Sequence, residues 1–167
     1  YRMSLKDVVE NYKLRNPEDY LEIKNEVSIK FEVTAIANIL EDKAPLLFFD
    51  KIEGYENYKL ISNVFSTKQK IYSYFGFTNE DKFYSFWATL SSRNIQYTVE
   101  KNDAPVKERI FTHSEVNLFS LPVPLHYPQD GGRYITSGII VAKDPENPKN
   151  VNLSFARIQI LSKNEVA

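Results

Sequence analysis

The sequence predicts an α+β protein in two parts: a small N-terminal α/β domain over residues 1–104 and the start of a β domain over 105–167. Three observations favour this division. Apolar residues recur at helical spacing in several segments of the first part. Short apolar or alternating runs lie between those segments, as strands do. The last third instead carries two long strand patterns, which follow a glycine turn.

The first part is expected to begin with a capped helix. Ser4 is followed three residues later by Asp7, which resembles a capping box, and apolar residues follow at helical spacing until Pro17 ends the helix. The remaining elements expected here are a strand over 20–24, a helix over 31–40, strands over 45–49 and 58–64, and helices over 67–75 and 80–93, separated by Gly76. A polar stretch around 100–104 ends this part.

The second part has a different pattern. Residues 105–112 look extended, and the prolines of 121–128 exclude a regular helix. The Asp130-Gly131-Gly132 sequence is a strong turn signal. Strands are expected over 133–142 and 151–161, as antiparallel neighbours joined by the connector 143–150. A lone hairpin is marginally stable in water, so we interpret this part as the opening of a larger β domain, cut short in this chain.

Composition excludes several classes of protein. The formal net charge of −1, with no basic block, argues against a nucleic-acid partner. The absence of cysteine excludes disulfides and thiolate metal sites, and it fits a reducing cytoplasm. Residues 1–11 lack the apolar core of a signal peptide, and the longest apolar runs, 45–49 and 138–142, are too short to cross a bilayer. We therefore expect a soluble, cytoplasmic protein.

Few single residues indicate a catalytic, metal-binding or anion-binding site by themselves. His113 and His126 have no metal-ligand spacing, so we interpret His113 as a surface or loop residue before a helix cap at Ser114, and His126 as a loop residue bonded to backbone. Arg157 lies in an apolar strand, where it is costly unless it meets an anion such as a carboxylate or phosphate. The alternative is that this strand simply exposes one polar face to solvent.

Several blocks together resemble a known family. They are 121–124 with His126, then 130–138 and 143–145, and most sharply Asn152-Leu153-Ser154-Phe155-Ala156-Arg157. Upstream, residues 32–37, 45–48 and Gly54-Tyr55 fit as well. This combination resembles the N-terminal portion of the UbiD family of prenylated-FMN-dependent decarboxylases, related to 3-octaprenyl-4-hydroxybenzoate carboxy-lyase.

The resemblance implies a reversible decarboxylase (a carboxy-lyase) that acts on an aromatic or α,β-unsaturated carboxylic acid. The cofactors implied are prenylated FMN and Mn²⁺ or another divalent metal, with K⁺ as a further candidate. Residues 105–167 would then be the first strands of a split β-barrel that binds the flavin. The chain would be inactive alone, would need the remainder of the decarboxylase or a complementary subunit, and would form a homo-oligomer when complete.

The same resemblance assigns the site. Asn152 is implied as a metal ligand, and Arg157 as the catalytic residue that holds the substrate carboxylate. Thr136, Ser154, Phe155, Ala156 and Arg157 are implied as cofactor-binding residues, whereas Gln159 receives no catalytic role. Asn152 and Arg157 are five residues apart, so strict strand alternation puts them on opposite faces, and we expect a bulge at 154–156 that brings them together.

Two other functions stay open. The chain could be a non-catalytic module for assembly or cofactor binding with the same scaffold. It could also be an ordinary FMN-binding split barrel, whose flavin needs no prenylation.

Overall fold

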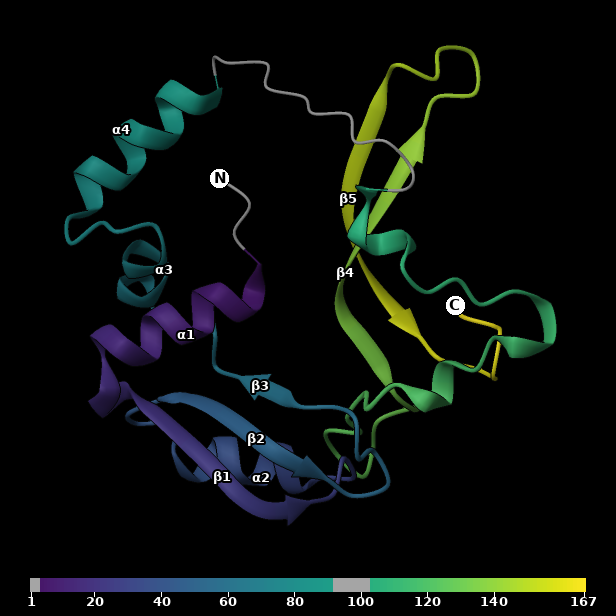
Figure 1. Ribbon diagram of the computed structural model, residues 1–167, viewed down its shortest axis with the longest axis horizontal. Coiled ribbons are helices and arrows are strands. Elements are labelled where there is room, and N and C mark those ends of the chain that lie inside the picture. Colours follow the sequence, from purple (N-terminus) through teal and green to yellow (C-terminus); the bar gives the residue numbers. More distant parts are fainter. Residues whose placement is uncertain (1–3, 92–102) are drawn as a thin grey trace. The chain divides into compact units, whose positions relative to one another are not determined.

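The computed structural model describes residues 4–91 and 103–167, and it contains both helices and strands (Figure 1). The chain divides into two compact units, each made of several segments. The first comprises residues 1–23, 40–48 and 61–111, and the second comprises 24–39, 49–60 and 112–167. The predicted mixture of helix and strand is confirmed. The described residues contain no closed barrel, so the split barrel stays a prediction, as does the domain boundary after residue 104.

The first helix, α1 (Leu5–Arg15), begins with the predicted capping box. The Ser4 side chain accepts a hydrogen bond from the Asp7 backbone N–H, and the Asp7 carboxylate accepts from the Ser4 backbone N–H in return. Those two bonds satisfy donors that a helix start otherwise leaves free. The helix ends before Pro17, which begins the short 3₁₀ helix η1 (Pro17–Asp19).

Three strands form one sheet in the order β1-β2-β3. Their bounds are Tyr20–Val27 for β1, Leu46–Ile52 for β2 and Leu60–Ser62 for β3. The helix α2 (Glu32–Ile39) follows β1 along the chain. The middle strand β2 is the most buried, because its apolar run leaves Leu46, Leu47 and Phe49 with no exposed surface. Such a run is typical of a strand that is covered on both faces.

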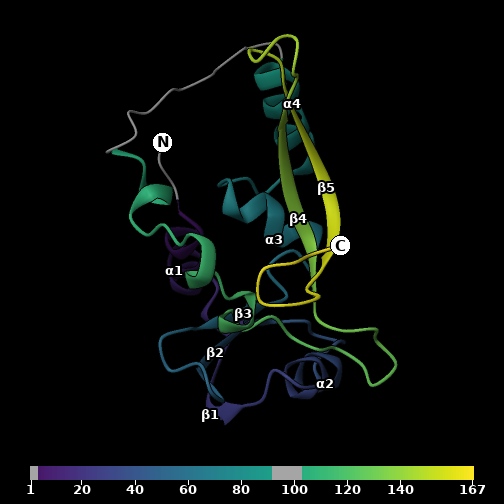
Figure 2. The same cartoon turned by 90° about the vertical axis from the view of Figure 1, so that its right-hand side faces the viewer.

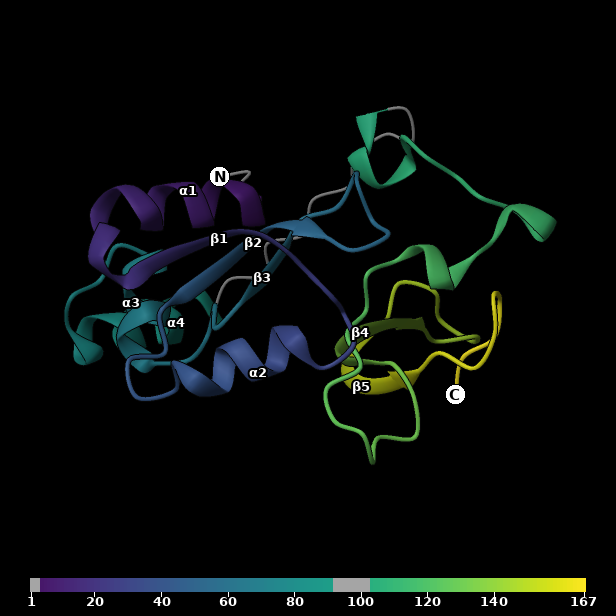
Figure 3. The same cartoon turned by 90° about the horizontal axis from the view of Figure 1, so that it is seen from below.

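In the first unit, α1 packs beside α3 (Lys68–Tyr74) (Figure 3). Val9, Tyr12 and Leu46 form the core there, with Tyr20, Ile61 and Tyr74 packed against it. The next helix, α4 (Glu80–Ser91), carries aromatic residues that contact those of α3 and its C-terminal turn. The predicted end of this helix at Arg93 lies outside the described residues.

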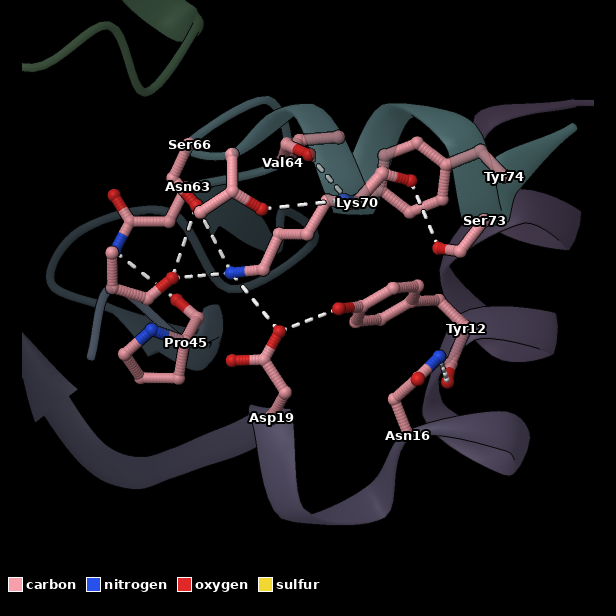
Figure 4. A network of polar contacts seen from close by, with 12 residues as sticks. Tyr12, Asn16, Asp19, Pro45, Asn63, Val64, Ser66, Lys70, Ser73 and Tyr74 are labelled. Carbon is pink, nitrogen blue, oxygen red and sulfur yellow. Dashed lines mark hydrogen bonds and ion pairs between the residues drawn. The ribbon is translucent and has the colours of Figure 1, made fainter. Parts of the chain in front are cut away.

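A buried lysine ties three segments of the first unit together (Figure 4). Lys70 of α3 is only 3% exposed, and its Nζ lies 3.2 Å from Oδ2 of Asp19. The ammonium group also donates to the Ala44 carbonyl and to Ser66 Oγ. Tyr12 of α1 donates from its hydroxyl to the same Asp19 oxygen. The charge of Lys70 is therefore matched by a carboxylate and two oxygen acceptors, as a buried ammonium requires.

In the second unit, the hairpin of β4 (Tyr134–Lys143) and β5 (Val151–Gln159) is the main regular structure (Figure 2). Both strands and their antiparallel pairing are as predicted. The proline-rich segment before the hairpin is extended, and it pairs at Leu125 with Lys30 in a single parallel bridge. Phe31 donates its backbone N–H to the Leu125 carbonyl at 2.9 Å, which fixes this segment beside the start of α2.

Two sequence predictions about loops were wrong. Residues 105–112 are not uniformly extended, because Pro105 begins a 3₁₀ turn, η3 (Pro105–Lys107). Proline suits that first position, since its fixed φ matches the turn. The cap of the next turn, η4 (His113–Glu115), is Thr112 rather than Ser114, because Thr112 and Glu115 form a capping box. A third short turn, η5, spans Leu118–Ser120.

None of the helices in the described ranges is long and apolar enough to cross a membrane.

Candidate functional site

All the predicted site residues lie on the β4–β5 hairpin. The register is regular from the connector up to Gly138, which pairs with Ala156. Asn152 stands opposite Ala142 near the connector. At the other end of the hairpin, Tyr134 pairs with Gln159 and Ile135 with Ile158. The predicted site residues of β5 therefore lie on one continuous strand with a single antiparallel neighbour, β4.

The hairpin does contain a bulge, but in β4. Between the pairs that Ile135 and Gly138 make, two residues of β4, Thr136 and Ser137, stand opposite one residue of β5, Arg157. The predicted bulge at 154–156 was wrong, because Ser154, Phe155 and Ala156 pair in unbroken register with β4. The extra residue lies instead in β4, the strand that follows the glycine turn.

Strand alternation then divides the site residues between two faces. Asn152, Ser154 and Ala156 share one face of β5, and Phe155 and Arg157 share the other. The bulge places both Thr136 and Ser137 opposite Arg157. Regular pairing through β5 therefore counts against a site in which Asn152 and Arg157 act from one face of the hairpin.

The chemistry of these side chains nevertheless fits a ligand. Thr136, Asn152, Ser154 and Arg157 are all exposed, and none of their side chains has a hydrogen bond to the rest of the described chain. Phe155 is 80% exposed, an unusual position for a large apolar ring. Along 151–158, β5 pairs only with β4 among the described residues, so its other edge is open. A ligand that crosses this edge can reach both faces.

Gly138 lets the side chain of Ile158 on the neighbouring strand lie close to the β4 backbone. A Cβ atom there would lie 2.7 Å from Cδ1 of Ile158 and 3.3 Å from the Ala156 carbonyl oxygen. Any larger residue at this position would therefore push against the opposite strand.

Asn152 sits next to an ordered connector. Asp144 accepts backbone hydrogen bonds from Glu146 and Asn147, and these bonds hold the pKa of its carboxyl below the usual value. Asp144 and Asn152 line the same pocket of about 350 Å³ at the hairpin end. Asn152 can supply one hard oxygen to a divalent cation. No group of three or more His, Asp or Glu side chains suited to a metal ion occurs in residues 4–91 and 103–167.

The two histidines lie outside this hairpin. His113 has a left-handed backbone conformation with φ of 49° at the start of η4, and it is exposed, as predicted. The Nδ1 atom of His126 is 2.7 Å from Oγ1 of Thr34 on α2. The expected backbone partner for His126 is therefore replaced by a side chain, which no local sequence pattern around His126 could identify.

Sequence reasoning missed the residues that fix the start of β4. Gln159 Nε2 donates to the Gly131 carbonyl at 2.9 Å, across the Asp130-Gly131-Gly132 turn. Arg133 Nη1 donates to the Tyr55 hydroxyl at 3.0 Å, and its guanidinium lies 5.6 Å from the ring centre of Phe119. The alternating pattern of β5 does mark Gln159 as a polar residue, but its partner is 28 positions away.

Comparison with known proteins gives two adjoining domain matches from one family. Residues 12–88 match the 3-octaprenyl-4-hydroxybenzoate carboxy-lyase N-terminal domain. Residues 97–167 match the Rift-related domain of the same carboxy-lyase. The hairpin and all the predicted site residues lie within the second match.

Curated relatives agree with these matches. A phenolic acid decarboxylase from Sedimentibacter hydroxybenzoicus is 31% identical over 154 residues, which cover 87% of this chain and 32% of the relative. An anhydromevalonate phosphate decarboxylase from Archaeoglobus fulgidus is 29% identical over 157 residues, covering 91% of this chain and 34% of the relative. The chain thus spans about a third of the length of the curated relatives it matches.

Solved structures extend the likeness to the fold. The vanillic acid decarboxylase of Sedimentibacter hydroxybenzoicus, in its closed form, is 27% identical with a TM-score of 0.81, covering 98% of this chain and 37% of that one. The UbiD-class enzyme HmfF from Pelotomaculum thermopropionicum, in complex with FMN, has a TM-score of 0.82 at 23% identity. The match covers 98% of this chain and 36% of that one. Both domain matches, the relatives and the fold lead to one conclusion: this chain belongs to the UbiD family, and it corresponds to the family's N-terminal and Rift-related domains.

Proposed function

We propose that the protein containing this chain is a prenylated-FMN- and metal-dependent decarboxylase of an aromatic or α,β-unsaturated carboxylic acid. One observation carries the proposal: the 152–157 segment lies on an exposed hairpin in the Rift-related match, with its polar side chains unbonded in the described chain. The relatives that act on phenolic acids support the aromatic substrate class. The relatives that act on anhydromevalonate phosphate leave the phosphorylated unsaturated acids as the other class.

Arg157 is the residue we assign to the substrate. A guanidinium presents two parallel N–H donors that match the two oxygens of a carboxylate, and it stays protonated at all working pH values. Arg157 would therefore orient the acid and fix its charge next to the cofactor. Ser154, Phe155 and Ala156 would line the flavin ring or its phosphate through their backbone groups, and Thr136 would lie close by, opposite Arg157.

Asn152 is the residue we assign to the metal. Its amide oxygen is a hard donor of the kind that Mn²⁺ or another divalent cation binds, and it would be one of several ligands. We propose Mn²⁺ as the metal, K⁺ as a further ion, and a homo-oligomer as the working form. Because Asn152 and Arg157 occupy opposite faces of β5, a cofactor that serves both would have to cross the strand's open edge.

When bound, prenylated FMN supplies the covalent chemistry that makes loss of carbon dioxide feasible. The chain's own contribution is to hold the acid at Arg157 and to bind the flavin and metal at the other hairpin residues. Decarboxylation also needs groups that the described residues do not supply, which is why we propose that this chain is inactive alone.

The test is carbon dioxide release by the complete protein loaded with prenylated FMN and Mn²⁺, with a panel of phenolic and unsaturated acids. The Arg157→Ala variant should lose roughly 100-fold or more in kcat/KM, the usual cost of removing one charge-stabilising group. Arg109→Ala is the matched control, because Arg109 is exposed and lies off the hairpin, and it should keep full activity.

Three results would contradict the proposal or redirect it. Turnover with plain FMN would favour an ordinary flavin-binding split barrel. Cofactor binding without turnover of any acid would favour a non-catalytic cofactor-binding module. Full activity in Arg157→Ala would remove the catalytic assignment of that residue.

A further inference from the structure

The bulge in β4 lies where the register between β4 and β5 shifts by one residue. From Lys143 to Gly138, each pair of residues across the hairpin follows one register. If that register continued, Ser137 would pair with Arg157, Thr136 with Ile158 and Ile135 with Gln159. Instead, Ile135 pairs with Ile158 and Tyr134 with Gln159, which is a shift by one residue.

The two registers give Thr136 different positions. A one-residue slip moves a side chain to the other face of a sheet. In the continued register, Thr136 would join the face of Ile158, and Ile135 would take its place on the face of Arg157. In the observed register, Thr136 and Ser137 both stand opposite Arg157. The bulge therefore decides whether the hydroxyl of Thr136 or the apolar side chain of Ile135 joins Ser137 on the face of the arginine.

Gln159 is placed to select the observed register. Its side-chain Nε2 donates to the Gly131 carbonyl at 2.9 Å, and the turn is thereby held against the end of β5. The fit is close: a Cβ on Gly132, whose φ is +150°, would lie 3.2 Å from the same Nε2 atom. A shift of β4 by one residue would carry Gly131 away from Gln159 and break this bond.

The backbone around Gln159 is fixed from its other side as well. Its N–H donates to the Ala167 carbonyl at 2.7 Å, and the Ala167 N–H returns a bond of 3.0 Å. The next residue, Ile160, donates to the Arg133 carbonyl at 3.0 Å. Asp130, at the start of the turn, is held to Tyr127 by two hydrogen bonds, and the Gln159 amide adds a bond at Gly131, which has no side chain of its own to fix it.

We propose that Gln159 is a positioning residue: by holding the 130–132 turn, it sets the β4 register that keeps Thr136 opposite Arg157, beside Ser137. This inference rests on the proposed function only in treating that face as part of the cofactor site. Gln159 lies two residues from Arg157 on the same face of β5, and it acts on the site through β4.

The test compares two substitutions of the same kind in the complete protein. Gln159→Glu keeps the size of the side chain but turns the donor into an acceptor that faces the Gly131 carbonyl. Gln129→Glu introduces the same charge in the adjacent loop, where Gln129 is exposed and has no hydrogen bond in the described chain. Gln159→Met keeps the length of the side chain and removes the amide, and with it the donor to Gly131, without adding a charge.

Three measurements are needed. Titration with FMN alone, followed by flavin fluorescence, measures cofactor binding, and thermal unfolding shows that each variant is folded. Amide hydrogen exchange over 130–137 shows how firmly the turn and the start of β4 are held. We expect Gln159→Glu to bind FMN roughly tenfold or more weakly, with Gln159→Met intermediate and Gln129→Glu unchanged, since about 1.4 kcal/mol corresponds to tenfold. Exchange over 130–137 should rise only in the two Gln159 variants.

The outcomes separate this inference from the proposed function. Wild-type binding of FMN together with an unaffected Gln159→Glu variant would overturn the role of Gln159 and leave the proposed function standing. A wild-type protein that binds neither FMN nor prenylated FMN would overturn the proposed function, and the exchange data would then decide the role of Gln159. Equal exchange over 130–137 in Gln159→Glu and Gln129→Glu would overturn that role.

Discussion

Replacement of Lys70 by methionine should destabilise the protein more than any other single change to a charged residue among those described. The lysine is 3% exposed, and its ammonium meets Asp19 at 3.2 Å, Ser66 Oγ at 3.0 Å and the Ala44 carbonyl (Figure 4). Methionine fills a similar volume, so the change removes the charge and leaves the packing nearly intact. What remains is a carboxylate that has lost its counter-ion.

The size of the loss in unfolding free energy depends on the hydrogen bonds that the neighbours of Lys70 keep after the substitution. Removal of one partner from a buried ion pair typically costs about 3–5 kcal/mol. The Asp19 side chain is 28% exposed and still accepts the Tyr12 hydroxyl, and the Ala44 carbonyl still accepts from Ser66. Because each of these groups keeps a hydrogen-bond donor, we expect a loss of about 2–3 kcal/mol, at or below the lower end of that range.

Urea unfolding followed by circular dichroism measures this loss as a lower midpoint with an unchanged slope. Lys68→Met is the matched control on the same helix. Lys68 is 69% exposed in its side chain and pairs with Glu80 at 3.4 Å, so its removal should cost less than about 1 kcal/mol. Equal losses for the two variants would refute the idea that burial makes Lys70 special.

Two further predictions concern the hairpin and the first helix. Gly138→Ala should cost about 1 kcal/mol, at the low end of the usual overpacking cost, because the nearest atom, Cδ1 of Ile158, is the end of a flexible side chain that can turn away. The added Ile158→Val change should remove most of that cost, and urea midpoints that do not recover in the double variant would count against the clash. The pKa of the Asp7 carboxyl is held below its usual 3.8, first by the Ser4 backbone N–H and then by its hydroxyl. This contribution to stability is therefore present above pH 3.8 and is lost as the pH falls through the folded-state value. Ser4→Ala should raise that pKa part of the way, and an unchanged value in an NMR titration of Asp7 would contradict the capping box.

Local patterns were enough to predict most of the fold. The Ser4 cap and Pro17 defined the first helix because both act within a few residues of themselves. The glycine turn and the two long strand patterns that follow it predicted the hairpin for the same reason. The turn at Pro105 and the cap at Thr112 were missed, because extended chain and a 3₁₀ turn differ in only a few dihedral angles.

The site was harder to predict because it depends on contacts between distant residues. The motif at 152–157 drew attention to the correct strand, but the spacing of Asn152 and Arg157 could not say which strand carries the bulge. That choice is made where Gln159 meets Gly131, and no pattern within β5 encodes it. The roles of Asn152 and Arg157 stay predictions.

Hydrogen exchange of the complete protein, with and without prenylated FMN and Mn²⁺, shows whether the hairpin binds the cofactor. We expect the cofactor and metal to slow exchange in β4 and β5, above all near Thr136 and over 152–157, while exchange in α1 stays the same. Protection elsewhere in the chain, with the hairpin unchanged, would contradict the assignment of the hairpin to the cofactor site.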